Sequence, residues 1–111
     1  MNRSKNILAD LPPTQDAEAF EPLVRGAGVL IERIVSQGQY SADGFWYEQP
    51  HAEWVMVVQG EAVIEWEEGS ITRLAAGDWV NIPAFRKHRV KWTDPEQETV
   101  WLAVHYPVVA E

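Results

Sequence analysis

The chain has 111 residues, no cysteine and a formal net charge of −8, from 9 Lys and Arg against 17 Asp and Glu. This length suits a single domain with its own core. The lack of cysteine excludes disulfides, thiolate metal sites and cysteine nucleophiles, and the acidic charge argues against nucleic acid as a partner because it repels phosphates.

The N-terminal part is the least regular. The opening MNRSKNILAD lacks the apolar stretch of a signal peptide, and no segment approaches the roughly 18 apolar residues needed to span a bilayer. We therefore expect a cytoplasmic protein without a membrane partner. The stretch LPPTQDAEAFEP has a proline pair, and residues 16–20 fit a helical turn. Residues 1–27 are thus predicted to be an arm with a short strand or helical turn.

From residue 28 the chain is rich in Val, Ile, Trp and Tyr, in short segments separated by Gly, Pro or Asp. Many short strands at regular spacing are typical of a sandwich or barrel. We predict an all-β domain over residues 28–106 and a tail over 107–111. The expected strands are 28–38, 44–49, 53–60, 61–69, 70–75, 77–83, 87–92 and 98–106.

Alternation along these segments assigns faces. In HRVKW, His88, Val90 and Trp92 share one side, and Arg89 and Lys91 the other. The last segment, TVWLAVHY, is apolar without alternation, which favours burial on both faces. A second subunit could supply the outer layer, so we predict a homodimer.

Six tryptophans stand in these segments. They suit core or interface packing, and the alternative is an aromatic-lined ligand cavity. Their positions are Trp46, Trp54, Trp66, Trp79, Trp92 and Trp101.

Two spaced patterns resemble the motifs of the cupin superfamily. Glu53 followed by Gly60 fits the end of the first motif, G-x5-H-x-H-x3-4-E-x6-G. Gly77, Pro83 and His88 fit the second, G-x5-P-x-G-x2-H-x3-N. The likeness covers roughly residues 28–106. It implies a small antiparallel jelly-roll β-barrel with a metal inside.

The resemblance assigns ligands residue by residue. Glu53 matches the carboxylate ligand and His88 the histidine of the second motif. Tyr47 and Gln49 stand where the first motif has its two histidines, and Phe85 stands at the glycine of the second. The asparagine of that motif is replaced by a tryptophan.

Other residues could rebuild a metal site. His51 and Glu53 share a face if both lie on one strand, and adding His88 gives two histidines and one carboxylate, the set of open non-haem iron sites. His105 is the remaining imidazole. Candidate metal ligands are therefore Glu53, His88, His51 and His105, for Fe, Mn, Zn or Ni.

Each candidate has a plainer interpretation. His88 could be a core histidine bonded to a carbonyl, and Glu53 the solvent-facing start of a strand. If it faces inward, Glu53 needs a partner, for which His88 is the candidate. His51 follows a proline and would lie in a turn, and His105 could pack at an edge or interface. The residues expected to line a cavity and contact a small-molecule ligand are Tyr47, Gln49, Trp46, Phe45 and Trp92.

Two functions remain open. One is a metal-dependent oxygenase, isomerase or decarboxylase, in which the ion acts as a Lewis acid or activates oxygen. The other is a metal-free module that binds or senses a small ligand without catalysis. The retained glutamate and histidine favour the first, and the missing first-motif histidines favour the second, so the sequence does not decide whether the chain is an enzyme.

Overall fold

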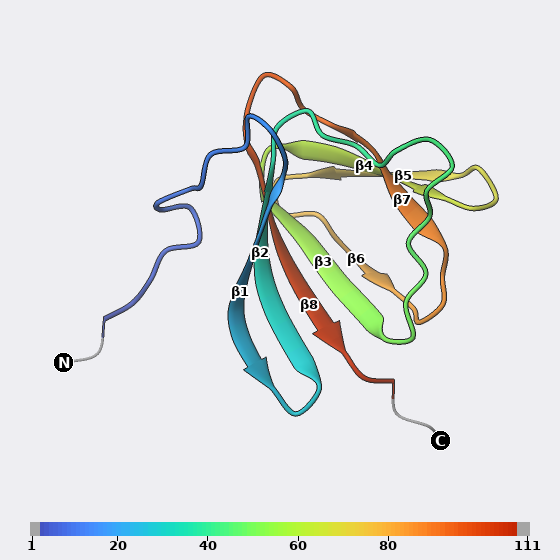
Figure 1. Cartoon of the computed structure of the whole chain (residues 1–111), viewed down its shortest axis with the longest axis horizontal. Coiled ribbons are helices and arrows are strands. Elements are labelled where there is room, and N and C mark those ends of the chain that lie inside the picture. Colours follow the sequence, from blue (N-terminus) through green and yellow to red (C-terminus); the bar gives the residue numbers. More distant parts are fainter. Residues whose placement is uncertain (1–2, 109–111) are drawn as a thin grey trace.

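In the part of the chain that the structure describes, eight strands form two antiparallel sheets set at an angle to each other (Figure 1). The computed structural model describes residues 3–108. One sheet has the order β1-β2-β8-β3-β6 and the other β5-β4-β7. The strands are β1 (Ala19–Gly26), β2 (Val29–Ser36), β3 (Ala52–Gln59), β4 (Glu61–Trp66), β5 (Ile71–Ala75), β6 (Trp79–Ile82), β7 (His88–Thr93) and β8 (Thr99–Tyr106).

The predicted all-β jelly-roll class is confirmed, although hydrogen-bonded ladders do not close the sheets into a barrel within residues 3–108. Side chains from both sheets fill the space between them, because alternate residues of each strand point inward. The buried cluster combines Ile34, Val55, Val57, Ala62, Ile64, Trp66, Leu74, Ile82, Trp101 and Ala103.

The prediction of a strand over residues 44–49 is wrong. This segment makes only an isolated bridge, between Tyr47 and His88. The amide of Tyr47 donates to the carbonyl of His88 (2.7 Å), and the amide of His88 donates back to the carbonyl of Tyr47 (3.1 Å). One exchanged pair of hydrogen bonds is enough to fix Tyr47 beside the first residue of β7.

The N-terminal segment joins the sheet. Within the expected arm the structure has a strand, β1, which pairs with β2 along its length. The buried guanidinium of Arg33 donates to the carbonyls of Ile7 (3.0 Å), Ala9 (2.7 Å) and Asp10 (3.2 Å), and it also binds the carboxylate of Glu21. A planar five-donor group suits this task. These contacts fasten residues 7–10 to the outer face of the sheet.

Strand β8 lies in the middle of its sheet, between β2 and β3. Its inward residues Trp101 and Ala103 are buried, whereas Leu102 and Val104 are only partly covered. The homodimer and the cytoplasmic location both stay predictions. Within the described chain, no helix is long and apolar enough to cross a membrane. Of the expected tail over 107–111, residues 109–111 lie outside the described residues.

Gly60 offers a test of the tight β3–β4 connection. Its φ is 93°, and a Cβ placed there would lie 2.7 Å from Cα of Thr99. Gly69 has a similar φ of 97° with open space around it. We expect Gly69→Ala to cost about 1 kcal/mol of unfolding free energy from backbone strain. Gly60→Ala should cost at least about 3 kcal/mol, because the clash adds to the strain.

Urea unfolding followed by circular dichroism measures both losses. Equal losses for the two variants would contradict the close approach of Gly60 to β8.

Candidate functional site

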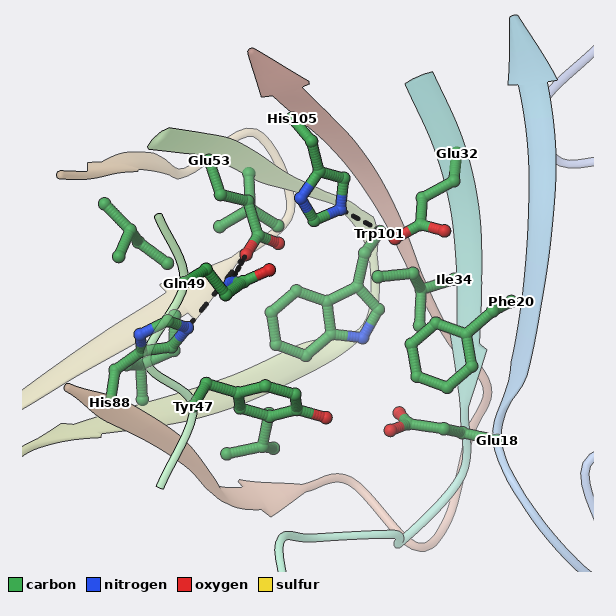
Figure 2. Close-up of a pocket in the computed structure, with 14 residues that line it drawn as sticks. Glu18, Phe20, Glu32, Ile34, Tyr47, Gln49, Glu53, His88, Trp101 and His105 are labelled. Carbon is green, nitrogen blue, oxygen red and sulfur yellow. Dashed lines mark hydrogen bonds and ion pairs between the residues drawn. The ribbon is translucent and has the colours of Figure 1, made fainter. Parts of the chain in front are cut away.

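A cavity of about 180 Å³ lies between the two sheets (Figure 2). Residues from β1, β2, β3, β4, β6, β7 and β8, and from the two segments before β1 and β3, form its walls. The lining consists of Glu18, Phe20, Glu32, Ile34, Tyr47, Gln49, Glu53, Val55, Ile64, Ile82, His88, Val90, Trp101 and His105.

Glu53 and His88 face each other across one end of the cavity. Oε1 of Glu53 lies 4.0 Å from Nε2 of His88, and the two side chains are 12% and 7% exposed. Nδ1 of His88 lies 2.8 Å from the carbonyl of Arg86. A carbonyl only accepts, so Nδ1 carries the proton and Nε2 of the neutral ring presents its lone pair to the cavity. This is how metal-binding histidines are usually oriented.

Neighbouring rings and an amide hold this pair in place. The imidazole of His88 stacks on Tyr47 at 5.5 Å between centroids, and Trp66 lies 6.1 Å away. Nε2 of Gln49 donates to Oε1 of Glu53 (3.2 Å). The two residues at the first-motif histidine positions therefore support the pair, one by stacking and one by donating a hydrogen bond.

The other two histidines pair with each other. Nε2 of His51 lies 3.0 Å from Nδ1 of His105, and Nε2 of His105 lies 2.8 Å from Oε1 of Glu32. Since a carboxylate accepts, Nε2 of His105 donates to Glu32. The hydrogen bond to Glu32 raises the pKa of His105 above 6.5, with burial opposing it and the charge of Glu53 adding to it.

A third carboxylate completes the polar lining. Ser36 Oγ–H donates to Oε2 of Glu18 (2.5 Å), and Nε1 of Trp101 donates to Ser36 Oγ (3.2 Å). Burial raises the pKa of Glu18, and the bond from Ser36 acts in the opposite direction. Figure 2 shows Glu18 and Glu32 on the side of the cavity away from His88.

Trp92 does not line this cavity. Val63 pairs with Trp92 and Ile64 pairs with Val90, so Lys91 is an extra residue in β7, a β-bulge. The bulge reverses the alternation, and Trp92 is 37% exposed on the other face. The expectation that it shares the face of the second-motif histidine is therefore wrong.

Two other expected lining residues lie outside the cavity. Phe45 is 46% exposed and packs edge-on against Tyr47, with centroids 4.8 Å apart. The ring of Trp46 lies under the guanidinium of Arg89, 5.8 Å from it. Both residues belong to the irregular segment before the bridge between Tyr47 and His88. Side chains in this segment do not alternate between two faces as they do along a strand.

Phe85, at the glycine position of the second motif, has a φ of 65°. Phe85 adopts the left-handed backbone conformation for which glycine is normally used. The amide of Phe85 donates to the carbonyl of Gln49 (2.6 Å). Its side chain is 64% exposed, so it does not narrow the cavity.

Two carboxylates that line the cavity, Glu18 and Glu32, were absent from the sequence-based candidates. For Glu32 there was a usable signal, since it alternates with Ile34 and Ser36 on β2 and so stands at an inward position. For Glu18 there was none, because it precedes β1 in an irregular segment.

The side chains as they lie do not complete a metal centre. Two ligands bound at about 2.1 Å in a tetrahedral site are about 3.4 Å apart, closer than the 4.0 Å between Glu53 and His88. Both ring nitrogens of His105 are engaged, and Gln49 turns its NH2 group to Glu53. No group of three His, Cys, Asp or Glu suited to a metal occurs among residues 3–108.

Fold and site together define a small jelly-roll domain with a polar centre inside a largely apolar cavity. The model of the Cupin domain matches residues 34–105. The chain therefore belongs to the cupin family. No curated protein matches it significantly.

Similar solved structures support this assignment. A protein from Ralstonia eutropha JMP134, provisionally assigned as a mannose-6-phosphate isomerase, is 47% identical, with a TM-score of 0.91 over 96% of this chain and 100% of that one. A cupin superfamily protein from Desulfitobacterium hafniense DCB-2 is 17% identical (TM-score 0.78; 97% and 94% covered). A protein of unknown function from Streptococcus pyogenes is 19% identical (TM-score 0.77; 99% and 91%). The last two show the fold alone.

Glu32→Gln tests the contact with His105. Loss of the carboxylate should lower the pKa of His105 toward 6.5. The pKa of His105 is higher in the folded protein than in the unfolded one. The contact with Glu32 therefore stabilises the fold fully below about pH 6.5, and this stabilisation is lost as the pH rises through the folded-state pKa. The unfolding free energy lost in Glu32→Gln should therefore be larger at about pH 5.5 than at about pH 8.5.

NMR titration of the imidazole and urea unfolding at both pH values measure this. Glu96→Gln, an exposed change of equal charge, is the control. An unaltered His105 titration in Glu32→Gln would rule the contact out.

Proposed function

We propose that this cupin domain binds a small molecule in the cavity, with Glu53 and His88 fixing one polar group of the ligand. The observation that carries this is the 4.0 Å gap between Oε1 of Glu53 and Nε2 of His88. Nε2 makes no hydrogen bond to any residue in the described part of the chain. One ligand nitrogen that carries two hydrogens can lie about 2.8 Å from both acceptor atoms and donate to each.

The chemistry of the walls suits binding and proton exchange. Apart from the phenol of Tyr47, the lining has no hydroxyl, thiol or amine side chain. His88 can accept a proton at Nε2, and Glu53 can hold the imidazolium that results. The proposal is therefore the metal-free binding or sensing module, with this pair at its centre.

Cavity size limits the ligand. An apolar protein cavity of about 150 Å³ holds one benzene molecule, and this one measures about 180 Å³. We infer a bound portion of about six to ten non-hydrogen atoms.

The charge of the cavity argues against a sugar phosphate as the ligand of this chain, although the Ralstonia eutropha protein is provisionally assigned as a mannose-6-phosphate isomerase. A sugar phosphate needs cationic groups or a cluster of amide donors. The described cavity walls contain no Lys or Arg. They do contain the carboxylates of Glu18, Glu32 and Glu53, which would repel a phosphate.

Binding can be tested by NMR with a mixture of small neutral, cationic and anionic probes of cavity size. We expect at least one probe to shift the amide signals of Tyr47, Gln49 and Glu53 and the imidazole signals of His88. His88→Ala should weaken that probe about tenfold, the effect of one lost hydrogen bond to a buried group. Probes that shift only residues outside the cavity would refute the proposal.

A second candidate is a metal centre, favoured by the orientation of His88. With Nδ1 bonded to a backbone carbonyl, Nε2 is ready to bind an ion that Glu53 would also reach after a small shift. Such an ion would supply Lewis-acid or oxygen-activating chemistry. Glu53 and His88 would hold it, and Tyr47 and Gln49 would shape the space beside it.

Metal content separates the two candidates. We expect protein purified without a metal-affinity tag, then incubated with Fe(II), Mn(II), Ni(II) or Zn(II) and desalted, to retain far less than one ion per chain by elemental analysis. Stoichiometric retention that His88→Ala abolishes would replace the metal-free proposal with the metal centre.

A further inference from the structure

The protein balances the negative charge of the cavity only in part, since Glu32 pairs with His105 at 2.8 Å and Glu53 lies 4.0 Å from His88. Glu18, Glu32 and Glu53 all line the cavity, and among the described lining residues only the two imidazoles can become cationic. Glu18 receives a hydrogen bond from Ser36, a neutral hydroxyl, and Glu53 receives one from a neutral amide. Carboxylates behind apolar walls favour a cation that enters with the ligand.

The phenol of Tyr47 lies on the side of the cavity that holds Glu18 and Glu32. In Figure 2 the hydroxyl of Tyr47 points toward Glu18 and away from His88. The aromatic lining residues Trp101 and Phe20 lie on the same side. Carboxylates and aromatic rings are therefore gathered at this end of the cavity.

An independent feature points to a ligand at the opposite end. His88 is 93% covered, yet Nε2 faces the cavity without a hydrogen bond to the residues that the structure describes. This nitrogen therefore offers a hydrogen-bonding position that a bound molecule can fill.

We propose that the ligand is a small organic ammonium ion with an apolar body, whose charged group lies near Glu18, Glu32 and the phenol of Tyr47 and whose second polar group lies between Glu53 and His88. This inference rests on the proposed function and adds the chemical class of the molecule. Carboxylates supply charge-assisted hydrogen bonds to the ammonium group, and ring faces attract cations. The aliphatic side chains Ile34 and Val55 would pack against the hydrocarbon.

Neutral and anionic ligands fit these walls less well. A neutral sugar or polyol could donate hydroxyls to the carboxylates but would leave their negative charge without a counterion. An anion would meet three carboxylates and no Lys or Arg among the described lining residues.

Three probes of nearly equal shape separate these classes: benzylamine, benzyl alcohol and benzoate. Benzylamine is a cation at pH 7, and each probe fits the size of the cavity. We expect benzylamine to bind at least about tenfold more tightly than benzyl alcohol, and benzoate not to bind. Titration by NMR, followed at the signals of Tyr47, Glu53 and His88, measures affinity and location together.

Charge-neutral variants identify the carboxylates that act. Glu18→Gln and Glu32→Gln should each weaken benzylamine about tenfold while leaving benzyl alcohol within about twofold, since only the charge of the ligand is affected. Glu96→Gln changes the net charge equally on an exposed loop outside the cavity and should alter neither affinity.

The outcomes separate this proposal from the preceding one. Benzyl alcohol or benzoate binding in the cavity as tightly as benzylamine would overturn the ammonium proposal and leave small-molecule binding intact. An affinity for benzylamine that falls equally in all three glutamine variants would also overturn it, because the effect would be net charge alone. If the probes shift only residues outside the cavity, both proposals fail.

Discussion

The partial burial of three carboxylates between two sheets is the constraint on which the interior of this protein depends. A carboxylate removed from water must find hydrogen bonds or opposite charge. Each one here receives a single donor: Ser36 for Glu18, His105 for Glu32 and Gln49 for Glu53. These donors come from different strands and loops, so the polar network also fixes how the elements around the cavity are placed.

The class of the fold and the centre of the site were predictable from local sequence. Short alternating segments indicate strands, and the spacing from Glu53 to Gly60 and from Gly77 to His88 locates the two residues that face each other across the cavity. Both residues begin or nearly begin a strand, where short-range spacing and spatial position are tightly linked.

The rest of the site depends on long-range register. One bulge at Lys91 turns Trp92 outward, and alternation alone contains no sign of it. His51 and His105 are 54 positions apart and meet because β3 and β8 are neighbours. They consequently pair with each other, whereas the sequence had suggested that both could join Glu53. Such pairings follow from strand order, which a single sequence does not specify.

The hydrogen bonds from Arg33 to the carbonyls of residues 7–10 have a consequence for how such proteins diverge. They hold the segment that leads into Glu18 and β1, and the residues Glu18, Phe20 and Glu32 all precede the stretch 34–105 that matches the Cupin domain. The conventional domain thus contains the Glu53–His88 pair but only part of the wall opposite it. Recognition at the two ends of the cavity can therefore change independently, and a chimaera that exchanges the first 33 residues between relatives would exchange one end while keeping the other.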